Sequence, residues 1–193
     1  YTVAEKQNIS ARNNLLITAN YLLDNCPPPD ILLIPGGGGI HADGTPFGSR
    51  KEMHNEILLN WIREKNKTVE LLLSVCTGSL ILAKAGLLEG LSATTHWKAV
   101  EAMREAAPNT KLFPEKRWVD NGLIILSAGV SAGIDMSLYV ISKLLGKEAT
   151  DLDGYVTQKA LAGTFYMVAE EENKIRKNPI ARTTDFSKKA SGS

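Results

Sequence analysis

The stretch that decides the fold of this chain is Leu71-Leu-Leu-Ser-Val-Cys76-Thr-Gly-Ser-Leu80. A short apolar run ends at a cysteine, and a threonine, a glycine and a serine then lead into a helical pattern. This order is typical of a nucleophile elbow, the sharp strand-to-helix turn that lifts a reactive side chain above a sheet. The helix that follows points its N-terminal N–H groups at the turn, which favours a thiolate. We therefore predict that Cys76 is a functional thiol.

The structural alternative for Cys76 is a small buried core residue, which is a common role of free cysteine. Its place at the strand-to-helix junction, directly before Thr77 and Gly78, favours the functional interpretation. The other cysteine, Cys26, precedes three prolines in a predicted loop with no base or helix start beside it. We predict that Cys26 is inert.

Strand and helix patterns alternate along the chain, which predicts an α/β sheet with helices on its faces. The apolar run at 31–34 has no polar interruption, which predicts a parallel strand buried on both faces. The amphipathic segment at 53–64 places Ile57, Leu58, Trp61 and Ile62 on one helical face. The expected elements are strands at Ile31–Ile34 and Val69–Val75, helices at Met53–Glu64, Thr77–Leu88, Trp97–Ala107 and Gly133–Leu145, and a hairpin of Arg117–Val119 with Leu123–Ser127.

Length and composition limit the kind of protein this can be. The chain has 193 residues, 44% of them hydrophobic, and its net charge of +1 gives no electrostatic case for nucleic acid or an anionic membrane. No apolar run is long enough to span a membrane, and the opening residues show no secretory signal pattern. Two cysteines without paired Cys/His spacing indicate no zinc site and reduced thiols. We expect a cytoplasmic protein with a single domain at 1–173 and a loose tail at 174–193.

A run of glycines, Gly36–Gly39, directly follows the predicted strand at 31–34. A glycine loop after a strand can bind phosphate, but neither G-x-G-x-x-G nor a P-loop lysine is present in the required context. Such a loop can also offer backbone N–H groups to an oxyanion. If Cys76 attacks a carbon whose neighbouring atom gains negative charge, the N–H groups of Gly37 and Thr77 are the natural donors. A tight turn is the structural alternative.

A histidine near a cysteine can activate the thiol as an ion-pair dyad. The candidate is His96 in Thr94-Thr-His-Trp97, although the residue directly after the cysteine is Thr77 rather than a histidine. A histidine at a strand end or a helix start can equally serve as a cap or in packing. His96 is therefore a candidate pocket residue with capping or packing as its alternative.

Small residues in Ser127-Ala-Gly-Val-Ser-Ala-Gly-Ile-Asp135 join a predicted strand to a helix, which suits a close approach of this loop to the pocket. Gly129 and Ser131 are its candidate pocket residues. Asp135 falls in the first turn of the helix predicted at Gly133–Leu145, where a carboxylate interacts favourably with the helix dipole. We therefore interpret Asp135 as a helix-start residue rather than a catalytic acid.

With these motifs together, the chain resembles the DJ-1/PfpI superfamily, most of all its isonitrile hydratase branch, and is similar to the ligand-binding domains of some AraC-type regulators. The resemblance implies a flavodoxin-like three-layer α/β sandwich, a mostly parallel sheet with helices on both faces, and commonly a homodimer. It implies no metal and no organic cofactor. The stretches that carry it are Pro27-Pro-Pro-Asp-Ile-Leu-Leu-Ile-Pro-Gly-Gly-Gly-Gly39, Ser74-Val-Cys-Thr-Gly-Ser79, Ala85-Gly-Leu-Leu-Glu-Gly90, Ala93-Thr-Thr-His-Trp97 and Gly129-Val-Ser-Ala-Gly-Ile-Asp135.

The resemblance also implies roles for individual residues. Cys76 would attack the terminal carbon of a small isocyanide, R–N≡C, and the thioimidate-type adduct would be hydrolysed to an N-substituted formamide. Thr77 would position the substrate or the thiolate, and Gly37 would line the pocket. The candidate pocket residues around Cys76 and Thr77 are Gly36, Gly37, Gly38, His96, Gly129 and Ser131.

Two parts of the family pattern have no match here. The family usually opens with a strand and a helix start carrying an acidic residue that reaches the cysteine, an aspartate acid/base in the hydratase branch. This chain begins with Tyr1-Thr-Val-Ala-Glu5, which looks like the second strand of the family. We expect either an N-terminal piece before Tyr1 or a domain without its first strand. After Gly146 the usual ending of the family is also missing.

Three functions fit these observations. The first is a cysteine-dependent hydratase of the isonitrile type, acting on a small and largely apolar substrate. The second is a non-catalytic domain that senses oxidation at Cys76 or binds a small ligand. The third is Cys-His amidase, protease or glyoxalase chemistry, which would require a nitrogen of His96 within hydrogen-bond distance of Cys76.

Overall fold

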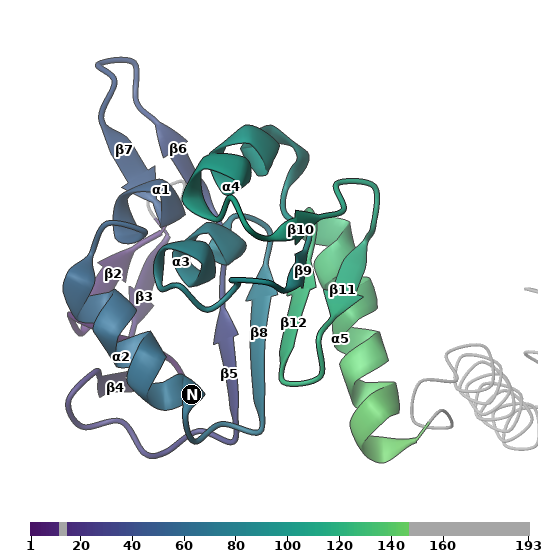
Figure 1. Ribbon diagram of the computed structural model, residues 1–193. Coiled ribbons are helices and arrows are strands. Elements are labelled where there is room, and N and C mark those ends of the chain that lie inside the picture. The colour runs from purple at the N-terminus through teal and green to yellow at the C-terminus, as the bar shows by residue number, and fades with distance from the viewer. Residues whose placement is uncertain (12–14, 147–193) are drawn as a thin grey trace, which may run out of the picture. The chain divides into compact units, whose positions relative to one another are not determined.

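The computed structural model of the chain describes residues 1–11 and 15–146. A four-stranded sheet lies at the centre of the fold (Figure 1). Its strands are β5 (Ile31–Ile34), β8 (Leu71–Val75), β11 (Trp118–Asp120) and β12 (Ile124–Ser127), in the order β11-β12-β8-β5. β8 runs parallel to both β5 and β12, and β11 pairs antiparallel with β12 as the predicted hairpin. The parallel strands therefore end at one edge of the sheet.

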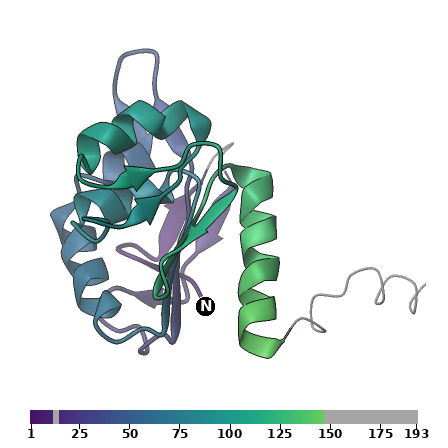
Figure 2. The same ribbon diagram turned by 45° about the vertical axis from the view of Figure 1, so that its right-hand side comes forward.

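Helices cover both faces of this sheet (Figure 2), which confirms the predicted α/β sandwich. Because successive side chains of a strand point to opposite faces, Leu72 and its neighbours Leu71 and Leu73 belong to different hydrophobic clusters. The cluster of Leu72 includes residues of α2 (Glu56–Asn66), α3 (Gly78–Lys84) and α4 (Val100–Ala106). The other cluster includes Met136 and Val140 of α5 (Val130–Leu145).

Short elements surround the central sheet. Most are strands in two-stranded pairs, and a 3₁₀ turn precedes α4. They are β1 (Val3–Ala4) with β4 (Tyr21–Leu22), β2 (Asn8–Ser10) with β3 (Leu16–Thr18), β6 (Gly38–Ile40) with β7 (Pro46–Gly48), β9 (Ser92–Ala93) with β10 (Lys111–Leu112), α1 (Ser49–Glu52) and the 3₁₀ turn Trp97–Ala99.

The helix predicted at Met53–Glu64 begins later than expected, at Glu56. The side chain of Asn55 accepts a hydrogen bond from the Leu58 N–H, and this N-cap fixes the start of α2. The predicted buried face is wrong in one residue, because Ile57 is 69% exposed and Leu59 is buried in its place. Leu59 and Ile62 lie three positions apart, on one face of the helix, and both are buried in the core.

Three other helix boundaries also differ from the sequence prediction. The helix expected to reach Leu88 ends at Lys84, because Gly86 adopts a left-handed backbone with φ +74°. The helix expected at Trp97–Ala107 starts as a 3₁₀ turn and becomes α-helical only at Val100. α5 begins at Val130 rather than Gly133.

The expected burial of both faces of β5 is wrong. Ile31 is 42% exposed and Leu33 is 44% exposed, whereas Ile34 is buried. In the described part of the chain β5 pairs only with β8, so it is an edge strand despite its fully apolar sequence. The apolar run therefore correctly identified a strand but not its environment.

Residues Tyr1–Val140 form one compact unit. Residues 147–173 and the tail predicted at 174–193 lie outside the described residues, so the division of the chain at 173 stays a prediction. No helix in the described part combines the length and hydrophobicity that a membrane span needs.

We predict that Leu72→Ala lowers the free energy of unfolding by about 2–5 kcal/mol, because it leaves a cavity beneath three helices. Urea unfolding followed by far-ultraviolet circular dichroism measures this change. The matched control is Ile57→Ala on the exposed face of α2, which should change the same free energy by less than about 0.5 kcal/mol. Equal losses for the two variants would contradict the observed division between core and surface.

Candidate functional site

The candidate site lies at the edge of the sheet where its parallel strands end. Ile34 of β5 stands opposite Ser74 of β8, and Ser127 of β12 stands opposite Val75. The segments that follow these strands carry the predicted site residues except His96, which follows β9, so the parallel register brings the others to the same edge. Ligands of open α/β sheets bind at this kind of edge.

Cys76 has the strained backbone of a nucleophile elbow. Its φ is +59°, and it is the only residue other than glycine with a positive φ in the described part of the chain. The Cys76 N–H donates to the carbonyl oxygens of Ser127 at 3.1 Å and Ala128 at 2.9 Å. The side chain is a partly exposed free thiol. An L-residue in this conformation carries a strain that its surroundings must offset.

Two glycines allow the loop after β5 to contact this turn. A Cβ at Gly36 would lie 2.7 Å from the Cβ of Cys76, and a Cβ at Gly78 would lie 2.3 Å from the carbonyl oxygen of Ile34. Any larger residue at either position would force the two backbones apart. Gly36 therefore lies against Cys76, and its predicted role in a substrate pocket stays a prediction.

Thr77 is held by hydrogen bonds to the glycine loop and to α1. The Gly37 N–H donates to Thr77 Oγ1 at 3.0 Å, and Ser49 Oγ lies 2.6 Å from both Thr77 Oγ1 and the carbonyl oxygen of Gly37. Of the two N–H groups predicted as oxyanion donors, that of Gly37 is thus engaged by a side chain. The Thr77 N–H has no hydrogen-bond acceptor among the described residues and is the remaining candidate.

Sequence reasoning missed two buried hydroxyl groups that bind the carbonyl oxygen of Cys76. Ser79 Oγ donates to the Cys76 carbonyl oxygen at 2.9 Å and lies 2.8 Å from Thr95 Oγ1, which is 3.2 Å from the same carbonyl. Both side chains are fully buried. The two threonines before His96 could have suggested hydroxyl groups near the elbow, but only the position of α3 shows which of them points to it. No local sequence pattern around Ser49 indicated a place at the elbow.

His96 acts as a cap and forms no pair with the thiol in the described structure. Its Nδ1 accepts the Lys98 N–H at 3.2 Å, and its ring stacks on Trp97. The ring also borders the pocket loop, since a Cβ at Gly129 would lie 3.6 Å from His96 Cδ2. Cys76 Sγ makes no hydrogen bond to any described residue, so the geometry does not support a Cys-His dyad.

The other predicted pocket residues take different places. Ser131 Oγ accepts a bond from Arg117 at 3.4 Å, and Asp135 forms an ion pair with the same arginine. Asp135 is not in the first turn of α5, because that helix starts at Val130. Gly38 lies in the β6–β7 hairpin, where a Cβ would meet the carbonyl oxygen of Phe47 at 2.1 Å.

The arrangement as a whole suits attack by a thiol on a small electrophile. Within residues 1–11 and 15–146, no group of three or more His, Cys, Asp or Glu side chains is placed to hold a metal ion. The hydrogen bonds that hold the turn come from hydroxyl groups and backbone N–H groups. Gly36 and Gly37 are exposed, so water reaches the turn.

Comparison with known sequences identifies related proteins. The profile of the DJ-1/PfpI family matches residues 1–143 of the chain. A second profile, described as a protein of unknown function (DUF4197), matches residues 130–192, which begin in α5 and continue outside the described residues. The DJ-1/PfpI match contains every element that builds the candidate site.

Two curated relatives carry different functions. Isonitrile hydratase of Pseudomonas putida is 33% identical over 145 residues, which are 75% of this chain and 58% of the hydratase. The HTH-type transcriptional regulator GbdR of Pseudomonas aeruginosa is 32% identical over 142 residues, which are 74% of this chain and 36% of the regulator. The chain thus spans little more than half the length of the first relative and about a third of the second.

Solved structures share the fold. A THiJ/PfpI family protein from Pseudomonas syringae matches with a TM-score of 0.66 and 28% identity, over 79% of this chain and 61% of that one. Drosophila melanogaster DJ-1beta matches with a TM-score of 0.59 and 21% identity, over 80% of this chain and 77% of that one. These matches confirm the predicted flavodoxin-like architecture.

We predict that Cys76→Gly is more stable than Cys76→Ala by about 1 kcal/mol, because glycine adopts a positive φ without steric cost. Both variants lack the thiol, so the difference in their free energies of unfolding in urea isolates the backbone strain. At a position with ordinary backbone geometry glycine would be the less stable of the two. That order would contradict the strained elbow.

Proposed function

The chain belongs to the DJ-1/PfpI family, and we propose that it is a cysteine-dependent hydratase of the isonitrile hydratase type. The observation that carries the proposal is Cys76, a partly exposed thiol held at φ +59° at the end of β8. The 33% identity to isonitrile hydratase supports this choice of reaction within the family. Cys76 would be the nucleophile and Thr77 the residue that positions it.

The proposed reaction adds water to R–N≡C. The Cys76 thiolate forms a C–S bond with the terminal carbon, and a proton enters at that carbon to give R–N=CH–S-Cys76. Water then adds its hydroxyl to the same carbon and its proton to the nitrogen. The C–S bond breaks as the hydroxyl proton passes to solvent, which releases R–NH–CHO and the thiolate. We propose the Thr77 N–H, which has no hydrogen-bond acceptor among the described residues, as the donor that stabilises the negative charge developing at the attacked carbon. No described carboxylate is hydrogen-bonded to the thiol, so we propose solvent as the proton source.

The proposal extends to the setting of the site. We propose a small, largely apolar isocyanide as the substrate, a homodimer as the assembly and the cytoplasm as the location, as the family resemblance implies. Light scattering of the purified protein measures the assembly directly. A monomer at micromolar concentration would contradict the proposed dimer without affecting the proposed chemistry.

We predict that Cys76→Ser lowers the rate of cyclohexyl isocyanide hydration by at least about a hundredfold, because a serine hydroxyl is a far weaker nucleophile at neutral pH than a thiolate. Chromatographic detection of N-cyclohexylformamide measures the rate. The matched control is Cys26→Ser, which changes the other cysteine in a loop and should leave the rate unchanged.

Failure of the wild-type protein to form formamide would overturn the proposed activity. Formation by Cys76→Ser at the wild-type rate would overturn the role of the thiol. Intact mass after rapid quenching supplies a direct view of the adduct, which adds the mass of one isocyanide to the protein.

We predict that Thr77→Val lowers kcat/KM for the isocyanide by about tenfold, because it removes the hydroxyl that binds the Gly37 N–H and Ser49. The conservative variant Thr77→Ser keeps that hydroxyl and should stay within about twofold of the wild type. The measurement is steady-state kinetics of both variants. Equal losses in the two variants would show that the hydroxyl is not what matters.

A second function is favoured by the likeness to GbdR, a transcriptional regulator. In this alternative the domain binds a small ligand or senses oxidation, and Cys76 performs no turnover. Intact mass after mild peroxide treatment discriminates the two. Selective addition of oxygen at Cys76, together with no formamide from an isocyanide, would favour the sensing function.

A further inference from the structure

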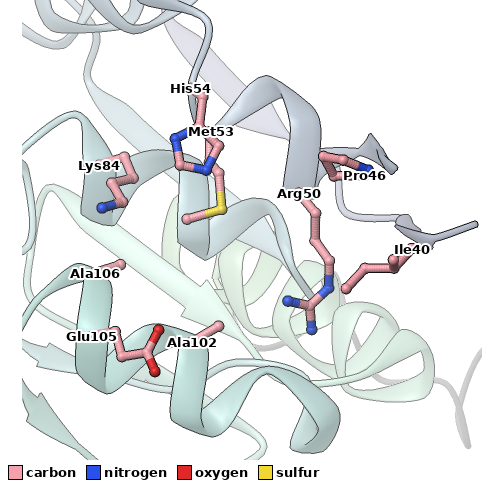
Figure 3. Close-up of a pocket in the computed structure, with 9 residues that line it drawn as sticks. All are labelled: Ile40, Pro46, Arg50, Met53, His54, Lys84, Ala102, Glu105 and Ala106. Atoms are coloured by element: carbon pink, nitrogen blue, oxygen red, sulfur yellow. The ribbon is translucent and has the colours of Figure 1, made fainter. Parts of the chain in front are cut away.

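A pocket lies apart from the elbow, between α1, α3 and α4 (Figure 3). Its volume is about 270 Å³. Arg50 and His54 come from α1 and the turn after it, Lys84 from the end of α3, and Glu105 from α4. Ile40 and Met53 add apolar surface. The pocket therefore combines charged groups from separate elements with an apolar wall.

The two cationic side chains of this pocket have no counter-ion. In the described part of the chain neither Arg50 nor Lys84 forms an ion pair, and neither does Glu105. Arg50 Nη2 instead donates to the carbonyl oxygen of Lys98 at 3.2 Å, which holds the guanidinium between α1 and the 3₁₀ turn before α4. A restrained guanidinium loses less side-chain freedom when it binds a ligand.

The charge of the pocket selects one class of ligand. Two cations opposed by the single carboxylate of Glu105 leave a net positive charge of one, which matches a monoanion better than a dianion. A carboxylate fits the planar guanidinium of Arg50 with two parallel hydrogen bonds. The apolar wall formed by Ile40, Met53 and Ala102 suits a hydrocarbon chain rather than a second polar group.

We propose that this pocket binds a small monocarboxylate with an apolar body. Arg50 holds the carboxylate, Lys84 at the other end of the pocket adds positive charge, and Glu105 opposes both (Figure 3). The site is distinct from the elbow, although α1 contributes to both. Ser49 of that helix faces Thr77, whereas the next residue, Arg50, lines the pocket.

Isothermal titration of the purified protein with hexanoate, at constant ionic strength, tests the proposal. We expect one hexanoate per chain, and we expect the neutral analogue hexanamide to bind at least about tenfold more weakly, because it carries no negative charge to pair with the guanidinium of Arg50. Arg50→Gln should weaken hexanoate binding by about tenfold, and Lys84→Gln by a smaller factor, because Lys84 lies at the other end of the pocket and contributes only longer-range charge. Glu105→Gln should tighten hexanoate binding, since this variant removes the opposing charge.

Two control variants make the result specific. Lys51→Gln removes a cation from the same helix, at an exposed residue that does not line the pocket, and should leave binding unchanged. Cys76→Ala should also leave it unchanged, which separates this pocket from the elbow and from the proposed hydratase activity. Melting temperatures of all variants confirm that each is folded.

Several outcomes would overturn the proposal. They are no hexanoate binding by the wild-type protein, equal binding of hexanoate and hexanamide, wild-type affinity in Arg50→Gln, and loss of binding in Cys76→Ala. Weaker binding in Glu105→Gln would overturn the assigned role of the carboxylate.

Discussion

A backbone-to-backbone contact between the loop after β5 and the turn after β8 supports the whole candidate site. Gly36 and Gly78 have no side chains where any Cβ would overlap the facing backbone. The contact brings the carboxyl end of one strand against the thiol on the next, and α3 starts directly from it. Because two chain segments meet without intervening side chains, small displacements there would move Cys76 itself.

Hydroxyl groups then hold the strained elbow from two sides. The hydroxyl groups of Ser49 and Thr77 connect it to the glycine loop. The hydroxyl groups of Ser79 and Thr95 donate hydrogen bonds to the carbonyl oxygen of Cys76. A positive φ at a residue other than glycine persists only where neighbouring contacts compensate its cost. These hydrogen bonds supply that compensation, and α1, which carries Ser49, also contributes Arg50 to the separate pocket between α1, α3 and α4.

Local sequence patterns predicted the elements that depend on local chemistry. The strands β5 and β8 and the β11–β12 hairpin were found near their predicted places, and the elbow was recognised from its order of residues. The start of α2 was wrong because a side-chain cap at Asn55 outweighed the periodicity of the hydrophobic residues. The predicted burial of Ile31 was wrong because an apolar strand has the same sequence pattern at the edge of a sheet and at its centre.

The sequence by itself determined that a cysteine stands on a strand-to-helix turn beside a glycine loop, because a turn, a strand and a helix start each leave a pattern within about ten neighbouring residues. Only the tertiary structure decided which groups surround that cysteine. It placed Ser49 and Thr95 at the elbow, turned His96 into a cap and paired Asp135 with Arg117. Such contacts join residues far apart in the chain, and their chemistry appears only when the sheet and its helices bring them together.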